Sequence, residues 1–293
     1  MDFLTDNKVP IGKWAQWAVD WLTDSAGWFF DALSSFLRVV IDALLLVLQG
    51  PEFVTRSANG EIYYALFVIV LISALAWFMR RSVSVVVLTA LGLLLIVNQG
   101  YWEETTDTLA LVLAATAVCM LIGVPLGIAA ARRPWVYAIL RPILDLMQTI
   151  PTFVYLIPAL ILFGLGMVPG LIATVIFAIP APVRLTRLGI ISTPGSLVEA
   201  AEAFGATPSQ VLRKVELPFA LPQIMAGLTQ TIMLSLSMVV IAALVGANGL
   251  GVPVVRALNT VNIAKGFEAG LCIVILAIIL DRLFKVSGEG EGA

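Results

Sequence analysis

One acidic side chain of this sequence stands inside a long apolar run, where a charge is costly and therefore suggests a role. Asp145 lies in the run 136–165, three residues before Gln148. Acids at such depth usually face a pathway or pair with another charge. A carboxylate here could assist a cationic amine, whereas a pair with Arg141, four residues earlier on a helix, would make Asp145 structural. The sequence favours the structural pair and leaves the pathway role as the alternative.

Four other side chains are candidates for contact with a positively charged amine. Phe153 and Tyr155 have ring faces that attract a trimethylammonium group, and Ser235 and Ser237 add hydroxyls in a later apolar run. Packing explains each aromatic residue better, and helix contacts explain the serines better. Together with Asp145 and Gln148, these four residues form a candidate translocation pathway.

Residues typical of catalysis and metal binding are scarce in this sequence. It has no histidine, and its two cysteines, Cys119 and Cys272, lie inside apolar runs, where we expect small buried hydrophobes. No G-x-x-x-x-G-K-[ST] loop occurs, so the chain is not expected to bind and hydrolyse ATP by itself. We therefore expect no catalytic, cofactor-binding or metal site, which argues against an intramembrane enzyme.

The stretch 199–218 is a charged island between two apolar runs, 168–183 and 219–245. Its charges cannot lie in hydrocarbon without a large cost, so both runs must end at a membrane surface. Residues 197–204 predict a short helix. Gly205 is suited to end that helix, and Pro208 suits the first turn of a second one. The island is therefore predicted to be a structured loop that faces water.

The composition predicts that most of the chain crosses a membrane. Apolar residues make up 60% and charged residues 12%, against about 25% charged in soluble domains. Roughly 20 apolar residues cross the hydrocarbon. The predicted spans are 62–79, 82–98, about 107–131, 136–165, about 168–188, 219–245 and 267–284. The fourth contains Pro142, Pro151 and Pro158 and is predicted to be kinked.

The distribution of arginine and lysine predicts the orientation of these spans. One set of loops and span ends carries Arg80, Arg81, Arg132, Arg133, Arg184, Arg187, Arg213, Lys214, Arg282 and Lys285. The loop 99–107 on the other side has three acids and no basic residue, although the outer loop 246–266 keeps Arg256 and Lys265. The bias predicts a cytoplasmic C-terminus, a periplasmic N-terminus and a cytoplasmic loop at 199–218.

Polar residues near the N-terminus recur on one line of a helix. They are Lys13, Asp20, Asp24, Asp31, Arg38, Asp42 and Gln49, with tryptophans 14, 17, 21 and 28 beside the line. This pattern is typical of helices lying in the membrane interface. An eighth span at 33–49 is the alternative, although it would bury Arg38 and Asp42. The predicted organisation is an interfacial segment 1–58, a membrane domain 59–286 whose cytoplasmic loop is 192–218, and a flexible tail 287–293.

The charged island resembles the signature loop of binding-protein-dependent ABC importer permeases. The matching positions follow the spacing E-A-A-x-x-x-G-x9-V-x-L-P, with valine in place of the usual isoleucine: Glu199, Ala200, Ala201, Gly205, Val215, Leu217 and Pro218. In that family the loop holds the coupling helix, which docks into a groove of the ATPase subunit. The resemblance implies the same docking role here, whereas the alternative is a generic cytoplasmic connector.

Longer stretches are similar to the permease of glycine betaine and proline betaine importers of the ProU type. They are DLMQTIPTFVYLIPALILFGLG, ATVIFAIPAPVRLTRLGI, TIMLSLSMVVIAALVGANGLG and IVILAIILDRL. The resemblance implies an all-α, MetI-like bundle of about seven spans in the bacterial inner membrane. It implies a homodimer, two ATPase subunits that bind ATP and magnesium, and an external substrate-binding protein. The implied cargo is glycine betaine, proline betaine or choline, and no nucleic acid is implied.

A stand-alone secondary transporter or channel for small amines is the alternative function. Such a protein would be expected to show inverted repeats and several intramembrane acids. No such repeat is evident in the sequence, and Asp145 stands nearly alone among the apolar runs. The sequence therefore favours the ATPase-coupled permease, and it does not indicate which amine is preferred.

Overall fold

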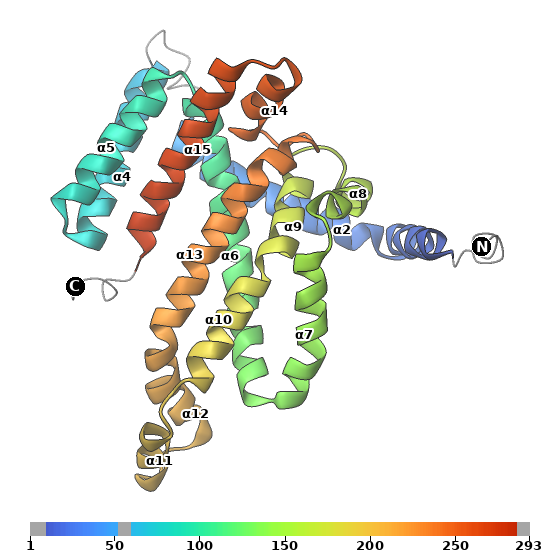
Figure 1. The fold of residues 1–293 in the computed structure, drawn as a ribbon, viewed down its shortest axis with the longest axis vertical. Coiled ribbons are helices and arrows are strands. Elements are labelled where there is room, and N and C mark those ends of the chain that lie inside the picture. The colour runs from blue at the N-terminus through green and yellow to red at the C-terminus, as the bar shows by residue number, and fades with distance from the viewer. Residues whose placement is uncertain (1–9, 52–59, 286–293) are drawn as a thin grey trace.

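The computed structural model describes residues 10–51 and 60–285, which form helices joined by short turns and contain no strand (Figure 1). The helices are α2 Ile11–Gln49, α4 Gly60–Arg80, α5 Val83–Asn98, α6 Trp102–Arg132, α7 Pro134–Thr149, α8 Thr152–Phe163, α9 Met167–Ala178, α10 Pro180–Ile191, α11 Gly195–Ala203, α12 Pro208–Val211, the π-helical turn η1 Leu212–Glu216, α13 Leu217–Ala243, α14 Gly251–Asn259 and α15 Ile263–Phe284. The predicted tail 287–293 lies outside the described residues. The predicted all-α fold is confirmed.

The predicted spans correspond to helices of the bundle. Within the described residues, five stretches are long and apolar enough to cross a membrane: Gly60–Arg80, Trp102–Arg132, Met167–Ile191, Pro208–Ala243 and Ile263–Phe284. The second predicted span is the shorter apolar helix α5. The fourth is a pair, α7 and α8, bent by 99°. A sharp bend therefore replaces the simple kink that its prolines predict.

Glycines set the packing at the centre of the bundle, where α6, α10 and α13 lie side by side (Figure 1). A Cβ atom on Gly127 of α6 would lie 2.7 Å from Thr186 Cβ and 2.7 Å from the Val183 carbonyl oxygen of α10. A Cβ on Gly189 of α10 would lie 2.9 Å from Ala220 Cβ of α13. Only small residues let helix backbones approach so closely, so these three helices form one tightly packed block, here called the central block.

The bend between α7 and α8 lies at Ile150, whose backbone is extended, and at Pro151, whose ψ of 133° is also non-helical. Ile150 precedes a proline, and such residues disfavour the helical conformation. Across the bend, the Tyr155 hydroxyl donates a hydrogen bond to the Met147 carbonyl oxygen at 2.7 Å. This contact ties the first turn of α8 to the last turn of α7.

The basic turns gather toward one end of the bundle. Figure 1 shows the α4–α5 and α6–α7 turns directed toward the end that carries α11 and α12, whereas α8 and α14 lie toward the other end. The Arg80 guanidinium donates to the Lys285 carbonyl oxygen, which places those two predicted cytoplasmic ends in contact. Glu103 and Glu104 begin α6 at the opposite end. The charge bias therefore matches the two ends of the fold, while the side of the membrane stays a prediction.

The N-terminal helix α2 has 39 residues, with a non-helical kink at Ala26. Figure 1 shows it running across the long axis of the bundle rather than along it. Its last residue, Gln49, donates amide hydrogen bonds of 3.0 Å to Thr106 Oγ1 and to Asp107 Oδ1 of α6. The crossing direction favours the interfacial interpretation over an eighth span. The interfacial position itself stays a prediction.

Candidate functional site

The candidate coupling loop, residues 192–218, begins with α11, which ends where the sequence predicts. Gly205 has φ +79°, the left-handed conformation that ends many helices. Its N–H donates to the Glu202 carbonyl at 2.8 Å, and the Ala206 N–H donates to the Ala201 carbonyl at 3.0 Å. These two hydrogen bonds close the last turn of α11, so the predicted role of Gly205 as the helix stop is confirmed.

The second half of the loop is built on a helix start. Pro208 occupies the first turn of α12, and the Thr207 N–H donates to Gln210 Oε1 at 2.8 Å. The π-helical turn η1 follows and leads into α13 without a break. π-turns inside helices are frequent at functional sites. The sequence predicts the helix start through Pro208, whereas no local pattern predicts the π-turn.

One arginine of the central block holds the coupling loop in place. Arg132, at the end of α6, donates from Nη2 to the Pro208 carbonyl oxygen at 2.7 Å. The same nitrogen lies 3.1 Å from Glu216 Oε2 in an ion pair. The loop is thus attached both to the start of α13 and to the end of α6. The sequence predicts Arg132 only as a cytoplasmic charge, and no local pattern indicates this contact.

The first helix of the loop, α11, is exposed on the surface of the chain. Within α11 no residue is buried, and the Phe204 side chain just after it is 94% exposed. Of the seven motif residues, Glu199, Ala200, Gly205 and Pro218 are exposed, and Ala201, Val215 and Leu217 are half-buried. An exposed apolar ring among small and charged residues suits contact with another protein surface.

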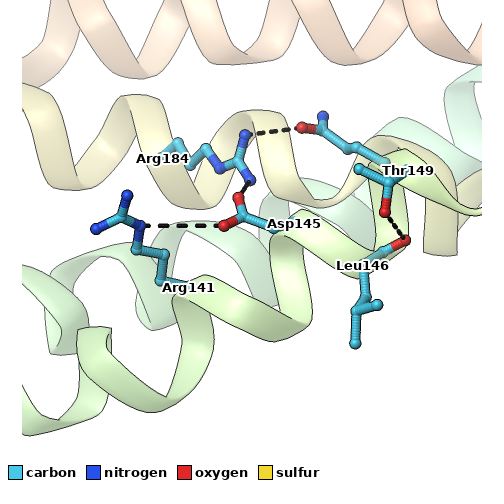
Figure 2. Close-up of polar contacts among 6 residues, drawn as sticks. Arg141, Asp145, Leu146, Thr149 and Arg184 are labelled. Carbon is cyan, nitrogen blue, oxygen red and sulfur yellow. Dashed lines mark hydrogen bonds and ion pairs between the residues drawn. The ribbon is translucent and has the colours of Figure 1, made fainter.

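Asp145 of the candidate pathway has a partner that sequence reasoning missed. Figure 2 shows Arg184 of α10 directed at α7. Its Nη2 lies 2.6 Å from Asp145 Oδ1, and its Nη1 donates to Gln148 Oε1 at 2.7 Å. The predicted partner, Arg141 Nε, is 4.0 Å from Asp145 Oδ2. The prediction that Asp145 pairs with an arginine is confirmed, but the shorter ion pair is made with Arg184.

This arrangement changes what Asp145 can do chemically. An arginine that contacts the carboxylate and the neighbouring amide together neutralises the charge. The Asp145 side chain is 55% exposed and the Arg184 side chain 37% exposed, so both border an open face. Because Asp145 is already paired, it is a weaker candidate for direct binding of a cationic amine than the sequence alone indicates.

The remaining candidate pathway residues do not join this cluster. Phe153 is exposed on α8, and Tyr155 uses its hydroxyl at the bend. Ser237 donates to the Met233 carbonyl of its own helix at 3.0 Å. Ser235 is buried, and within the part of the chain that the structure describes its hydroxyl has no hydrogen-bond partner. The helix-contact interpretation thus fits Ser237, whereas the hydroxyl of Ser235 stays unexplained.

The residues considered for other chemistry lie apart from these sites. Cys119 and Cys272 are free and buried, as the sequence predicts for small hydrophobes. Across residues 10–51 and 60–285, no group of three or more histidine, cysteine, aspartate or glutamate side chains is placed to hold a metal ion. Neither the coupling loop nor the α7–α10 contacts contain such a group.

Comparison with known proteins identifies relatives over almost the whole chain. Residues 123–289 match the family described as binding-protein-dependent transport system inner membrane component. The glycine betaine transport system permease protein OpuAB of Bacillus subtilis is 44% identical over 97% of this chain and 98% of its own length. The glycine betaine/proline betaine transport system permease protein ProW of Escherichia coli is 42% identical over 96% of this chain and 76% of its own length.

Solved structures show the same fold. A chain of the MetNI methionine ABC transporter, in an inward-facing conformation, aligns with a TM-score of 0.55 and 26% identity. The alignment covers 60% of this chain and 88% of that chain. The similarity therefore extends to nearly all of the shorter protein and leaves parts of this chain without a counterpart.

Proposed function

This chain belongs to the family of binding-protein-dependent transport system inner membrane components, and from this premise we propose that it moves quaternary-ammonium solutes into the cytoplasm. It is a multi-pass inner-membrane permease component of an ABC transport system. The cargo class is glycine betaine, proline betaine or choline. Relatives that are named for glycine betaine and match over nearly the whole chain support this cargo.

The coupling loop is the element through which we expect ATP hydrolysis to act. The observation that carries this part of the proposal is the exposed α11, with Phe204 outside its last turn and Gly205 in the left-handed conformation. A partner that binds this loop differently in two nucleotide states shifts the permease between two conformations. Glu199, Ala200 and Ala201 on α11 are the proposed docking residues, and Val215, Leu217 and Pro218 join the loop to α13.

The proposed assembly contains two copies of this chain, two ATP-binding subunits and an external substrate-binding protein. ATP and magnesium belong to the partner subunit, and this chain supplies no catalytic residue. The end of the bundle with α11 and α12 faces the cytoplasm, as does the C-terminus, and the N-terminus is periplasmic. Closure of the ATPases moves the coupling loop and opens the dimer toward the loaded binding protein, and hydrolysis resets it.

The choice of cargo depends mainly on the binding protein, because the chain itself offers little charge for recognition. Asp145 is already paired with Arg184, so a small cation would meet ring faces such as Phe153. A stand-alone transporter is not favoured, because family membership places the chain in a multi-subunit system.

Uptake of radiolabelled glycine betaine into vesicles tests the proposal. We expect ATP-dependent uptake when the chain is reconstituted with its ATPase subunit and binding protein, and no uptake by the chain alone. Unlabelled proline betaine and choline are added as competitors. The extent to which each lowers the uptake of glycine betaine ranks the preference among the three solutes. Uptake by the chain alone would contradict the proposal and restore the stand-alone alternative.

A further inference from the structure

Two arginines of α10 contact α7 along one line. Arg184 contacts Asp145 and Gln148, as described above. One turn later on α10, the Arg187 guanidinium carbon lies 3.5 Å from the centre of the Tyr137 ring. Arg184 thus holds the C-terminal half of α7 through charge, and Arg187 holds its N-terminal half through a cation–π contact.

The apolar contacts of α7 are few. Leu144 is its single buried residue, and Leu140 and Met147 pack, partly buried, against the same apolar core. By contrast, α10 is packed against α6 and α13 at glycine-sized distances. Helices joined at backbone distance move together, whereas side-chain contacts can be broken and remade. The two arginine contacts are therefore the adjustable joint between α7 and α10.

The joint lies between the two features that transport must connect. On one side, α10 is followed after only three residues by α11, so displacement of the coupling loop reaches α10 directly. On the other side, α7 continues through the 99° bend into α8, with Tyr155 hydrogen-bonded across the bend. Phe153, the exposed aromatic candidate for cargo contact, is on α8.

We propose that Arg184 and Arg187 are positioning residues that hold α7 on α10, so that movement of the coupling loop reaches the α7–α8 bend. This inference rests on the proposed function and adds the residues that would carry the movement. Neither arginine is proposed to contact ATP or cargo. Their role is to keep α7 and α10 in register while the loop is displaced.

Arginine suits both contacts better than lysine does. The planar guanidinium reaches Asp145 and Gln148 with separate nitrogens, and its flat face stacks on Tyr137. Lysine has a single charged nitrogen and cannot reproduce either geometry. We therefore expect Arg184→Lys and Arg187→Lys to impair the joint, even though both keep the positive charge.

The test uses the complete complex in vesicles, with radiolabelled glycine betaine and released phosphate measured together. Arg184→Met is expected to leave ATP hydrolysis within about twofold of wild type and to lower the amount of betaine imported per ATP about tenfold. Arg184→Lys is expected to give an intermediate loss. The matched control is Arg133→Met, an exposed arginine in the α6–α7 turn, which should keep the wild-type ratio.

A double-mutant cycle shows whether Arg184 acts through Asp145. Arg184→Met and Asp145→Asn combined should lower the import ratio no further than Arg184→Met alone, because both remove the same contact. Losses that multiply would contradict the pairing and overturn the proposed role of Arg184.

A spin-label pair measures the joint without relying on transport. Labels at Ile139→Cys on α7 and Leu188→Cys on α10 use two exposed positions. The assembled complex has two labelled copies, so distances between copies also occur. We expect the within-chain distance to give a narrow peak that is broadened by Arg184→Met and unaffected by Arg133→Met. An unchanged distribution together with an unchanged import ratio overturns the inference. Failure of the wild-type complex to import betaine would instead contradict the proposed function.

Discussion

The central block and α7 are both helical, but they are held in different ways. In the block, glycines let α6, α10 and α13 approach until an added Cβ would overlap atoms of the neighbouring helix. In α7, one residue is buried and two more pack partly buried on the core, and polar side chains make the short contacts to α10. The central block should therefore move as one rigid body, whereas α7 can change its position relative to the block. Substitutions in the two parts should therefore fail differently, the first in stability and the second in transport.

The largest effect is expected at the glycine contact between α6 and α10. Gly127→Val places a branched side chain where even a single added Cβ would lie 2.7 Å from the Val183 carbonyl oxygen. Overpacking of this kind costs about 3 kcal/mol, so we expect little folded protein after detergent extraction. Gly270→Val is the matched control, because nothing within 4 Å faces its Cβ. Equal yields from the two variants would contradict the close packing.

The next effect is expected at the turn of the coupling loop. Gly205→Trp must adopt the left-handed backbone, which costs about 1–2 kcal/mol per residue, and it adds a large ring beside the docking helix. Because the space around Gly205 is open, membrane insertion should be intact while ATP-dependent uptake falls at least about tenfold. Gly205→Asn is the control, since asparagine tolerates this conformation. Normal transport by Gly205→Trp would contradict the coupling assignment.

A smaller effect is expected where Arg132 anchors the loop. Arg132→Met leaves Glu216 without its charged partner and removes the hydrogen bond to Pro208. Hydrogen bonds to charged groups contribute about 1.5–3 kcal/mol, and partial exposure places this one toward the lower end. We expect faster proteolysis of the loop and a modest loss of uptake, whereas Arg133→Met should resemble wild type. If the coupling loop were equally resistant to proteolysis in both variants, Arg132 would not anchor it.

The smallest effect is expected from Arg141, the partner of Asp145 that the sequence predicts. Its nitrogen is 4.0 Å from the carboxylate and both side chains are largely exposed. Such pairs contribute roughly 0–1 kcal/mol. Arg141→Gln should therefore leave thermal stability and uptake near wild type, in contrast to Arg184→Met. A loss of uptake as large as that of Arg184→Met would show that Arg141 is the functionally important partner of Asp145.

The sequence predicts features that depend on nearby residues. Helix α11, its end at Gly205 and the start of α12 at Pro208 all follow from residues within about ten positions of one another. The spans follow from the length of apolar runs, because hydrocarbon thickness sets that length. The motif in 199–218 indicates the family, and it too depends only on residues that are close in the sequence.

Contacts between distant segments could not be predicted in the same way. Arg184 is 39 positions from Asp145, and the pattern within one helix indicates only the nearer Arg141. Gln49 belongs to the predicted polar line, but nothing in that line indicates Thr106 or Asp107 as its partners. Three prolines predict a kink in the fourth span, whereas the 99° angle depends on how α8 packs on the rest of the fold. These features depend on tertiary packing, and a single sequence does not encode them in its local pattern.

The most direct test of the central claim is a cross-link from the coupling loop to the ATPase subunit. A photoreactive benzoylphenylalanine at Phe204, the exposed ring beside α11, is compared with one at Phe67, an exposed position on α4. In the assembled complex, we expect a cross-link to the ATPase subunit from position 204 and none from position 67. We also expect its yield to differ between the nucleotide-free and ATP-trapped states. A complex that hydrolyses ATP and imports betaine, but gives no cross-link from position 204, would contradict docking of the coupling loop on the ATPase subunit.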